Sequence, residues 1–406
     1  MVRRSAALGR TAAALLGALL AVLPAASARA DSVRDAEWTL DALHAHDAWR
    51  TTQGAGVTVA VLDTGVDGTH PDLAGQVLPG NDLIGFGSGP GDSTWAKHGT
   101  GMAAIIAGHG HGPGYSQGVL GIAPRAKILP VRVILEEKDP RRDEARASRG
   151  KAVPDGIRWA TDHGAGVINL SLGDDSATAA PTADYDNAIQ YALGKGVVVV
   201  ASAGNGGEQA DRASYPAAYP GVIAVAAVDR VGAHASFSTR RWYASVSAPG
   251  VDVILADPNR KYYEGWGTSP ASAYVSGAVA LIRSAYPKLG PAQIKQLLES
   301  TTRERPAGGR SDAVGTGLMD PAAALKAAAK LEPPGEAPTP APSARRYFGA
   351  GPTITLSPAA DGGGLGDGVA VACALLGGVL VGAAALLWFR PRLGRSRRRA
   401  THGIPT

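Results

Sequence analysis

Cysteine is nearly absent from this sequence: the 406 residues contain only one, Cys373. A single cysteine cannot close a disulfide within the chain, which excludes a small domain held together by disulfides. Aromatic residues are also scarce, at 5% of the chain, whereas glycine occurs 54 times. The fold must therefore take its stability from a large core of small and aliphatic side chains, in which helices and strands approach one another closely.

Acidic residues are missing from both ends of the chain, residues 1–30 and 390–406. At the N-terminus, three arginines precede or flank the start of an apolar run, AAALLGALLAVLPAA, and the small-residue pattern ARA closes the segment. A basic start, a short apolar middle and small residues before a cleavage point are typical of a secretory signal peptide. A membrane anchor is the weaker alternative, because the run is short. We therefore predict a signal peptide over residues 1–30.

No charged residue interrupts residues 368–389, GVAVACALLGGVLVGAAALLWF. About 20 apolar residues are enough to span a bilayer as a helix, and the arginine-rich segment 390–406 is expected to stay in the cytoplasm. The sequence thus predicts a single-pass cell-membrane protein with its N-terminal part outside the cytoplasm. Gly378 and Gly382 form a GxxxG pattern, which either marks a helix-dimer face or is coincidental in a segment so rich in small residues.

The middle of the chain is weakly acidic, although the formal net charge of the whole sequence is +5. The excess of basic residues comes from the ends, with four arginines in residues 1–30 and six in 390–406, so that residues 31–389 carry a net charge of −5. Nucleic-acid binding requires a basic surface. We therefore expect no nucleic-acid partner.

A folded block extends over residues 31–331, and a linker rich in Pro, Gly and Ala follows at 332–367. Within the block, continuous β-branched runs alternate with helical patterns, which predicts an α/β fold whose mainly parallel sheet has helices on both faces. Ligands of such sheets bind at the carboxyl ends of the strands. The expected strands are 57–63, 127–134, 166–173, 196–204 and 222–229, and the expected helices are 98–108, 154–164, 184–196, 269–287 and 290–301.

Four polar residues stand where such a site would form: Asp63, His98, Asn205 and Ser269. Asp63 ends the first expected strand and either orients another group or caps a turn. His98 precedes a helix of small residues and is one of nine histidines, so alone it indicates little. Asn205 follows a buried strand and either tolerates a left-handed turn or donates its amide to an oxyanion. Ser269 is either a helix start or a nucleophile.

Taken together, the segments VAVLDTGVDGTHPDL, HGTGMAAIIAG, ASAGN and GTSPASAYVSG resemble the signature segments of the subtilisin-like serine proteases, peptidase family S8. The order Asp, His, Ser along the chain is the one that subtilisin uses. The resemblance covers residues 38–320 and implies a three-layer α/β/α subtilisin-like fold. Within the family the chain is similar to the mycosins, membrane-anchored subtilases associated with type VII secretion. The short N-terminal piece, the Pro-rich linker, the single span and the basic tail carry that similarity.

The resemblance implies a role for each matching residue. Ser269 would attack the scissile carbonyl, His98 would act as base and then as acid, and Asp63 would orient His98 and stabilise its charged form. The Asn205 side chain and the Ser269 backbone N–H would bind the oxyanion. The implied substrate-binding residues are Ser171, Leu172 and Gly173, which would pair with an extended peptide, and Ala203 and Gly204, which would wall the first specificity pocket.

Two positions depart from the pattern of the family. Pro270 follows the expected nucleophile, where the family usually has Met or Phe, and a proline pushes the residue before it away from helical angles. Gly101 stands where a histidine is frequent. The sequence also leaves only about 26 residues between Ala30 and Val57, too few for the long inhibitory propeptide of many subtilases. We therefore expect an enzyme that is not held latent by a prodomain.

No cofactor or metal is predicted. Calcium stays open, because many subtilases bind it and Asp72 matches a ligand position of the family, but the loop that completes that site has no clear counterpart. The histidine pairs at 44/46 and 109/111 lack a third ligand at a fitting spacing, which favours ordinary loop residues over a metal site.

Two functions remain in competition. The first is a membrane-anchored serine endopeptidase, outside the cytoplasm, that cleaves protein or peptide substrates through an acyl-enzyme and has secretion-machinery proteins as partners. The second is a weakly active or inactive structural subunit of a secretion complex. An α/β-hydrolase esterase is disfavoured, because the chain contains no G-x-S-x-G motif.

Overall fold

The computed structural model describes residues 31–331. The predicted signal peptide, linker, membrane span and basic tail lie outside the described residues, so these boundaries stay predictions. Among the described residues, no helix is both long enough and apolar enough to cross a bilayer.

A seven-stranded sheet runs through the middle of the described residues, with the strand order β2-β5-β1-β6-β7-β8-β9. Every neighbouring pair in it is parallel, which confirms the expected parallel sheet. The strands are β1 (Thr58–Asp63), β2 (Asn81–Asp82), β5 (Lys127–Arg132), β6 (Val167–Leu170), β7 (Val198–Ser202), β8 (Ile223–Val228) and β9 (Ala244–Pro249). Two of them, the short edge strand β2 and the strand β9, were not expected from the sequence.

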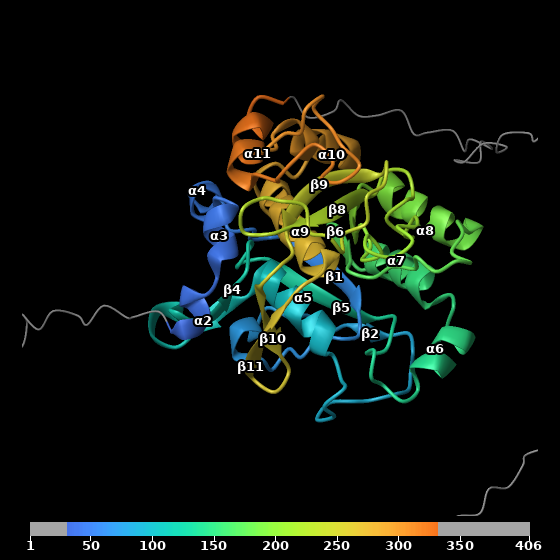
Figure 1. Ribbon diagram of the computed structural model, residues 1–406. Helices are drawn as coiled ribbons and strands as arrows, with labels where there is room; N and C mark the ends of the chain where they lie inside the picture. Colours follow the sequence, from blue (N-terminus) through green and yellow to red (C-terminus); the bar gives the residue numbers. More distant parts are fainter. Residues whose placement is uncertain (1–30, 332–406) are drawn as a thin grey trace, which may run out of the picture. The chain divides into compact units, whose positions relative to one another are not determined.

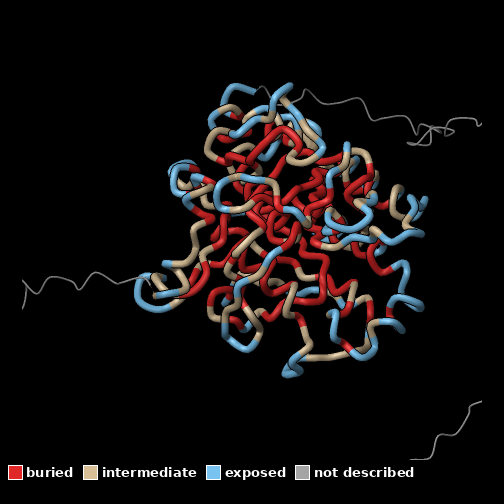
Figure 2. Tube along the Cα trace, in the orientation of Figure 1, coloured by how far each residue is buried: buried red, intermediate tan, exposed pale blue. Residues whose placement is uncertain are grey.

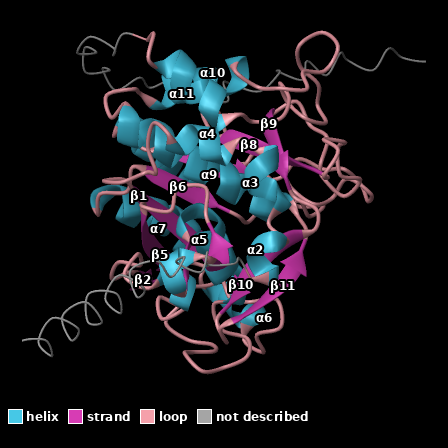
Figure 3. Cartoon of the chain, turned by 90° about the vertical axis from the view of Figure 1, so that its left-hand side faces the viewer, coloured by secondary structure: helices cyan, strands magenta, loops and turns pink. Residues whose placement is uncertain are grey.

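Helices cover both faces of this sheet, as Figure 1 and Figure 3 show. On one face lie α5 (Lys97–Ala107) and α9 (Thr268–Ala285), and on the other lie α6 (Arg142–Ser148), α7 (Ala152–Asp162) and α8 (Ala183–Gly194). Alternation along β1 explains the two layers: Val59 and Val61 pack into the first core, whereas Ala60 and Leu62 pack into the second. Figure 2 shows the buried residues concentrated in these inner layers. The three-layer α/β/α expectation is confirmed.

Smaller elements surround the layers. The N-terminal helices are α2 (Ser32–Asp35), α3 (Trp38–Ala42) and α4 (Ala45–Trp49), and the C-terminal ones are α10 (Pro291–Ser300) and α11 (Pro321–Ala328). Two antiparallel hairpins pair β3 (His109–His111) with β4 (Gln117–Leu120) and β10 (Val253–Asp257) with β11 (Lys261–Gly265). Short 3-10 turns occupy η1 (Pro71–Leu73) and η2 (Pro113–Tyr115). The hairpin β10–β11 packs on α5, close to the carboxyl edge of the sheet.

Candidate active site

The candidate residues come from five elements that meet at the carboxyl edge of the sheet. Asp63 is the last residue of β1, the segment beginning at Ser171 follows β6, and Asn205 stands beyond the end of β7. His98 and Ser269 lie in the first turns of α5 and α9, the two helices that pack together on one face. Since parallel strands end at the same edge, residues far apart in sequence are collected in one place.

Asp63 and His98 are in direct contact. The Nδ1 atom of His98 lies 2.8 Å from Oδ1 and 2.9 Å from Oδ2 of Asp63, whose side chain is fully buried. The backbone N–H of Thr64 donates to the same carboxylate at 2.7 Å. Burial lowers the pKa of His98, but the Asp63 carboxylate and, less strongly, the Glu136 carboxylate outweigh it, so that the pKa lies above its ordinary value of 6.5. The His98 side chain remains one third exposed, which leaves it open to a reacting group.

Ser269 lies in the first turn of α9, which begins at Thr268 after Gly267. The φ of Gly267 is +144°, a conformation that favours glycine. Pro270 therefore also falls in the first turn, where a backbone N–H has no partner within the helix and its loss costs little. The Ser269 Oγ donates to the backbone carbonyl of Ser171 at 3.2 Å. In the described part of the chain no hydrogen bond joins this hydroxyl to His98.

The Asn205 side chain is fixed against the start of α9. Its Oδ1 accepts from the Thr268 backbone N–H at 3.0 Å and from the Thr268 Oγ1 at 2.9 Å. Among the described residues, its Nδ2 makes no hydrogen bond, and Asn205 is exposed. The Asn205 Oδ1 is thus anchored to Thr268, the residue before Ser269, and the Nδ2 donor is available to a ligand.

The predicted substrate-binding residues follow the ends of β6 and β7. The Ser171 side chain is buried and Gly173 is exposed, so the segment runs from the core to the surface. Ala203 is fully buried, and Gly204 has a φ of +109°. A Cβ added to Gly204 would lie 2.9 Å from the Cβ of Ser214, so a larger residue would collide with its neighbour. Leu170 and Ala201 are register partners in β6 and β7, so the two segments leave the sheet side by side. The roles of Ser171, Leu172, Gly173, Ala203 and Gly204 in substrate binding stay predictions.

A buried network of hydroxyl groups lies beneath Ser269. The Ser272 Oγ lies 2.9 Å from the Ser171 Oγ and donates to the Ser269 carbonyl at 2.9 Å. The Ser276 Oγ donates to the Asn169 Oδ1 at 2.9 Å, and the Asn169 Nδ2 donates to the Ser171 Oγ at 2.9 Å. These bonds tie α9 to β6 directly below Ser269. Of the serines in this helix, only Ser269 was singled out from the sequence, so the network was missed; the polar Asn169 inside an apolar strand was the available signal.

Glu136 was also missed. Its Oε1 accepts a hydrogen bond from the backbone N–H of His98 at 2.8 Å. The signal in the sequence was the acidic pair at 136–137, which stands one residue beyond the expected strand 127–134.

The surroundings of Asp72 do not fit a calcium ion. Asp72 is fully buried; its Oδ1 lies 2.6 Å from the His111 Nδ1, and its Oδ2 accepts from the Val119 N–H and the Tyr262 hydroxyl, each at 2.8 Å. Calcium requires six to eight oxygen ligands, whereas this carboxylate is occupied by N–H and O–H donors. Among residues 31–331, no group of three or more His, Cys, Asp or Glu side chains is arranged to hold a metal.

Arg34 of α2 lies against the hairpin β3–β4, which carries His111. The Arg34 guanidinium donates to three backbone carbonyls at distances of 3.0 to 3.4 Å, that of Tyr115 at the end of η2 and those of Gln117 and Gly118 at the start of β4. His109, on the same hairpin, is bonded to backbone carbonyls of Gly110 and Ala74. These backbone carbonyls are therefore hydrogen-bonded to the positively charged Arg34 side chain.

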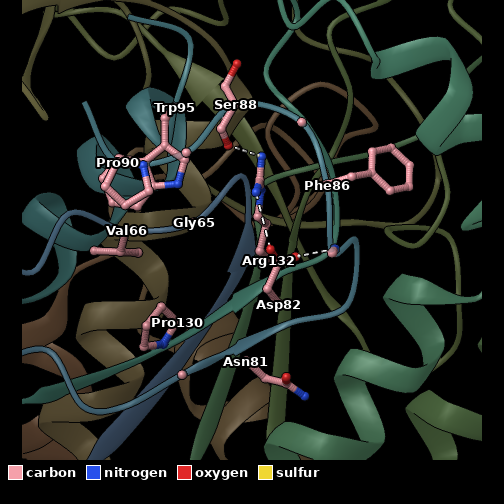
Figure 4. Close-up of a pocket in the computed structure, with 14 residues that line it drawn as sticks. Gly65, Val66, Asn81, Asp82, Phe86, Ser88, Pro90, Trp95, Pro130 and Arg132 are labelled. Carbon is pink, nitrogen blue, oxygen red and sulfur yellow. Dashed lines mark hydrogen bonds and ion pairs between the residues drawn. The ribbon is translucent and has the colours of Figure 1, made fainter. Parts of the chain in front are cut away.

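A hollow of about 490 Å³ lies on the β2 side of Asp63. Figure 4 shows Arg132 in its middle, bonded to Asp82 and to the Ser88 carbonyl, with Trp95 beside Pro90 and Val66. Arg132 is the register partner of Asp63, so the two side chains emerge on the same face of the sheet. The hollow therefore adjoins the carboxyl edge on the side away from Ser171.

Known proteins of similar sequence and structure belong to one protease family. Residues 54–317 match the Subtilase family, Peptidase_S8. Fervidolysin of Fervidobacterium pennivorans is 38% identical over 315 residues, which cover 71% of this chain and 43% of fervidolysin, so the chain spans less than half the length of that relative. The crystal structure of MycP1 from Mycobacterium smegmatis superimposes with a TM-score of 0.63 and 29% identity, covering 77% of this chain and 89% of that one. The MycP3 protease from the type VII (ESX-3) secretion system gives a TM-score of 0.59 and 31% identity, covering 75% and 90%.

Proposed function

The chain belongs to the subtilase family, and from this premise we propose that its folded domain is a serine endopeptidase. The observation that carries the proposal is the contact of His98 with the buried Asp63 carboxylate, at 2.8 and 2.9 Å, beside a serine at the start of α9. A histidine whose Nδ1 side is held by a carboxylate presents Nε2 to a hydroxyl as a base. The substrate is a protein or peptide.

The reaction follows from the positions of these groups. His98 takes the proton of the Ser269 hydroxyl as Oγ attacks the carbonyl carbon, and Asp63 stabilises the imidazolium that forms. The Asn205 Nδ2 and the Ser269 backbone N–H donate to the oxyanion. His98 then passes its proton to the leaving amine, which departs and leaves an acyl-enzyme at Ser269. Water, deprotonated by His98, hydrolyses the ester and restores the serine.

The activity is tested by labelling the purified full chain with a fluorophosphonate probe, which reacts with activated serines. Wild type should be labelled and Ser269→Ala should not. Ser284→Ala is the matched control, because Ser284 lies on the same helix and donates to the Ala55 carbonyl, away from Asp63. Labelling that persists in Ser269→Ala removes this serine as the nucleophile.

The structural-subunit alternative has one observation in its favour, the bond of the Ser269 hydroxyl to Ser171 instead of His98. A hydroxyl held there permanently would not be activated. Folded wild type that takes no label at any pH between 6 and 9 would support this second function.

We also propose that residues 368–389 anchor the enzyme in the cell membrane with the folded domain outside the cytoplasm, and that its partners belong to a secretion machine. The uncharged run and the basic tail support the anchor, and the likeness to the MycP3 protease supports the secretion context. Full-length chain should stay in the membrane fraction after alkaline carbonate washing, whereas a chain ending at residue 367 should be released. Release of both would contradict the anchor.

A further inference from the structure

The segment that follows β5 touches both halves of the Asp63–His98 pair. The backbone N–H groups of Val133 and Ile134 donate to the Asp63 carbonyl, at 2.9 and 3.4 Å. Two residues later, the Glu136 carboxylate accepts from the His98 backbone N–H at 2.8 Å. Residues 133–136 therefore connect the end of β1 to the beginning of α5.

The start of α5 lacks a cap of its own. Its N-cap residue is Ala96, with a left-handed φ of 54° and no side chain able to accept a hydrogen bond. The first N–H groups of a helix have no partner within the helix and are normally satisfied by a polar N-cap side chain. Glu136, from a different part of the chain, supplies the acceptor that the His98 N–H would otherwise lack. Its negative charge also interacts favourably with the positive end of the helix dipole at the N-terminus of α5.

The segment that carries Glu136 is itself held in place. The Asp139 carboxylate is buried and accepts from the backbone N–H groups of Ser88 and Arg141, each at 2.8 Å. The Arg142 guanidinium donates to the Leu135 carbonyl at 3.4 Å. A carboxylate on an anchored segment fixes its partner more firmly than one on a free loop.

We propose that Glu136 is a positioning residue for His98, which it holds by the backbone N–H at the start of α5 while adding a second negative charge to the surroundings of the imidazole. The inference rests on the proposed function and deepens it. Glu136 touches neither the substrate nor the reacting atoms and acts only through His98.

Other charged groups around His98 also raise or lower its pKa. Asp63 faces it from β1, and Arg142 from α6 opposes the two carboxylates. On α5 itself, the Lys97 ammonium lies 3.2 Å from the Asp257 carboxylate of β10 and 4.2 Å from the ring centre of Tyr263 on β11, so that charge is partly neutralised. The Asp63 and Glu136 carboxylates favour the protonated imidazole, and removing the charge of Glu136 should therefore lower the pKa of His98.

Two substitutions separate position from charge. Glu136→Gln keeps an oxygen that accepts from the His98 N–H but removes the charge; Glu136→Ala removes both. The control is Glu137→Gln, which removes the same charge from the neighbouring, exposed residue. All three are made in the full chain, and the rate of labelling by the fluorophosphonate probe, together with peptide hydrolysis, is followed from pH 5 to pH 9.

His98 must be neutral to act as a base, so the acid limb of the rate profile follows its pKa. Glu136→Gln should move this limb to lower pH by about 0.5 unit while the plateau rate stays near that of wild type. Glu136→Ala should show the same displacement and, in addition, a plateau roughly tenfold lower, because the imidazole is less well placed. Glu137→Gln should move the limb by less than half as much.

The proposal is overturned if the limb of Glu136→Gln coincides with that of Glu137→Gln, or if Glu136→Ala keeps the wild-type plateau. A general loss of structure is detected separately, since it would lower the thermal midpoint and the plateau of Glu136→Ala without moving its acid limb. Failure of the proposed function has a different signature: wild type itself would then take no label at any pH.

Discussion

The Ser269 hydroxyl donates to the backbone carbonyl of Ser171 at 3.2 Å, at the segment with which a substrate strand is expected to pair. A peptide that pairs with residues 171–173 would compete for the backbone groups of this segment. For attack, the hydroxyl has to leave this acceptor and turn toward the His98 Nε2. On the proposed function the contact with Ser171 is a resting position, and the hydrogen bond to His98 forms when substrate is present.

The first prediction concerns Asn205. Replacing it with leucine keeps the size of the side chain but removes the Nδ2 donor, so kcat should fall by about 100- to 1000-fold with little change in KM, because the donor acts on the oxyanion formed in the transition state. Leucine also leaves the Thr268 N–H without its acceptor.

The bracing of α9 by the Asn205 Oδ1 is tested by Thr268→Val, which deletes the hydroxyl that donates to this oxygen at 2.9 Å and leaves the backbone N–H bond and the Nδ2 donor in place. This variant should keep kcat within about tenfold of wild type. Steady-state hydrolysis of a peptide amide gives kcat for both variants, and thermal unfolding checks that each is folded. Equal losses of kcat in the two variants would mean that Asn205 serves as a brace and not as an oxyanion donor.

Much of the central architecture follows from sequence pattern. The strands expected at 57–63, 127–134 and 222–229 are present within one or two residues of their bounds, because unbroken β-branched runs are typical of parallel strands buried on both faces. Strand β9, with the sequence ASVSAP, was missed: alanine, serine and proline favour strands weakly, and only burial between β8 and the C-terminal segment makes it one. The strand expected at 196–204 also lies within two residues of its bounds, whereas the one expected at 166–173 was three residues too long at its end, since its last residues leave the sheet to form the candidate site.

The site could be predicted only in part, because the remaining residues act through contacts distant in sequence. Asp63, His98, Asn205 and Ser269 sit at strand ends and helix starts, which a linear pattern reveals. Glu136 meets His98 across 38 positions of sequence, and no local pattern indicates such a pair. Pro270 was expected to push Ser269 away from helical angles, but α9 begins at Thr268 and includes Ser269, with the proline next to it in the first turn.

The second prediction concerns Gly277, where α9 passes closest to the segment after β4. A Cβ added there would overlap the Ile122 Cγ2, and Ile122 is fully buried. Gly277→Ala should therefore lower the free energy of unfolding by about 1–3 kcal/mol, even though alanine favours a helix interior over glycine by about 1 kcal/mol.

Gly194 supplies the control for this prediction, because it ends α8 and an added Cβ meets nothing within 4 Å. Gly194→Ala should be neutral or stabilising by up to about 1 kcal/mol. Urea denaturation of Gly277→Ala, Ile122→Ala and the double variant then forms a cycle. The double variant should be less destabilised than the sum of the single ones, because the new methyl group occupies space that Ile122 vacates; strict additivity would place the effect elsewhere.

The third prediction concerns Glu37, which lies between α2 and α3 and attaches these N-terminal helices to the core. Its carboxyl accepts from the Leu120 N–H at 2.9 Å and pairs with the Arg34 Nε at 2.9 Å, and its side chain is only 5% exposed. Burial raises the pKa of Glu37 from its ordinary 4.5 to about 8, against the opposing effects of Leu120 and Arg34. The folded chain therefore keeps a proton between pH 4.5 and 8 that the unfolded chain has released. Since stability falls with pH wherever the folded state binds more protons, this group stabilises the fold fully below pH 4.5, and that contribution is lost as pH rises toward 8.

Glu37→Gln, which cannot titrate, should remove this slope. Its free energy of unfolding relative to wild type should rise with pH by at most about 1.4 kcal/mol per unit between pH 5 and pH 8, and the two curves should run parallel above that range. Urea denaturation of the full chain at four pH values measures the difference, with Glu264→Gln as an exposed carboxylate control that should stay parallel to wild type throughout. A constant difference between Glu37→Gln and wild type from pH 5 to pH 8 would mean that Glu37 is ionised in the folded chain and that Arg34, not burial, governs its charge.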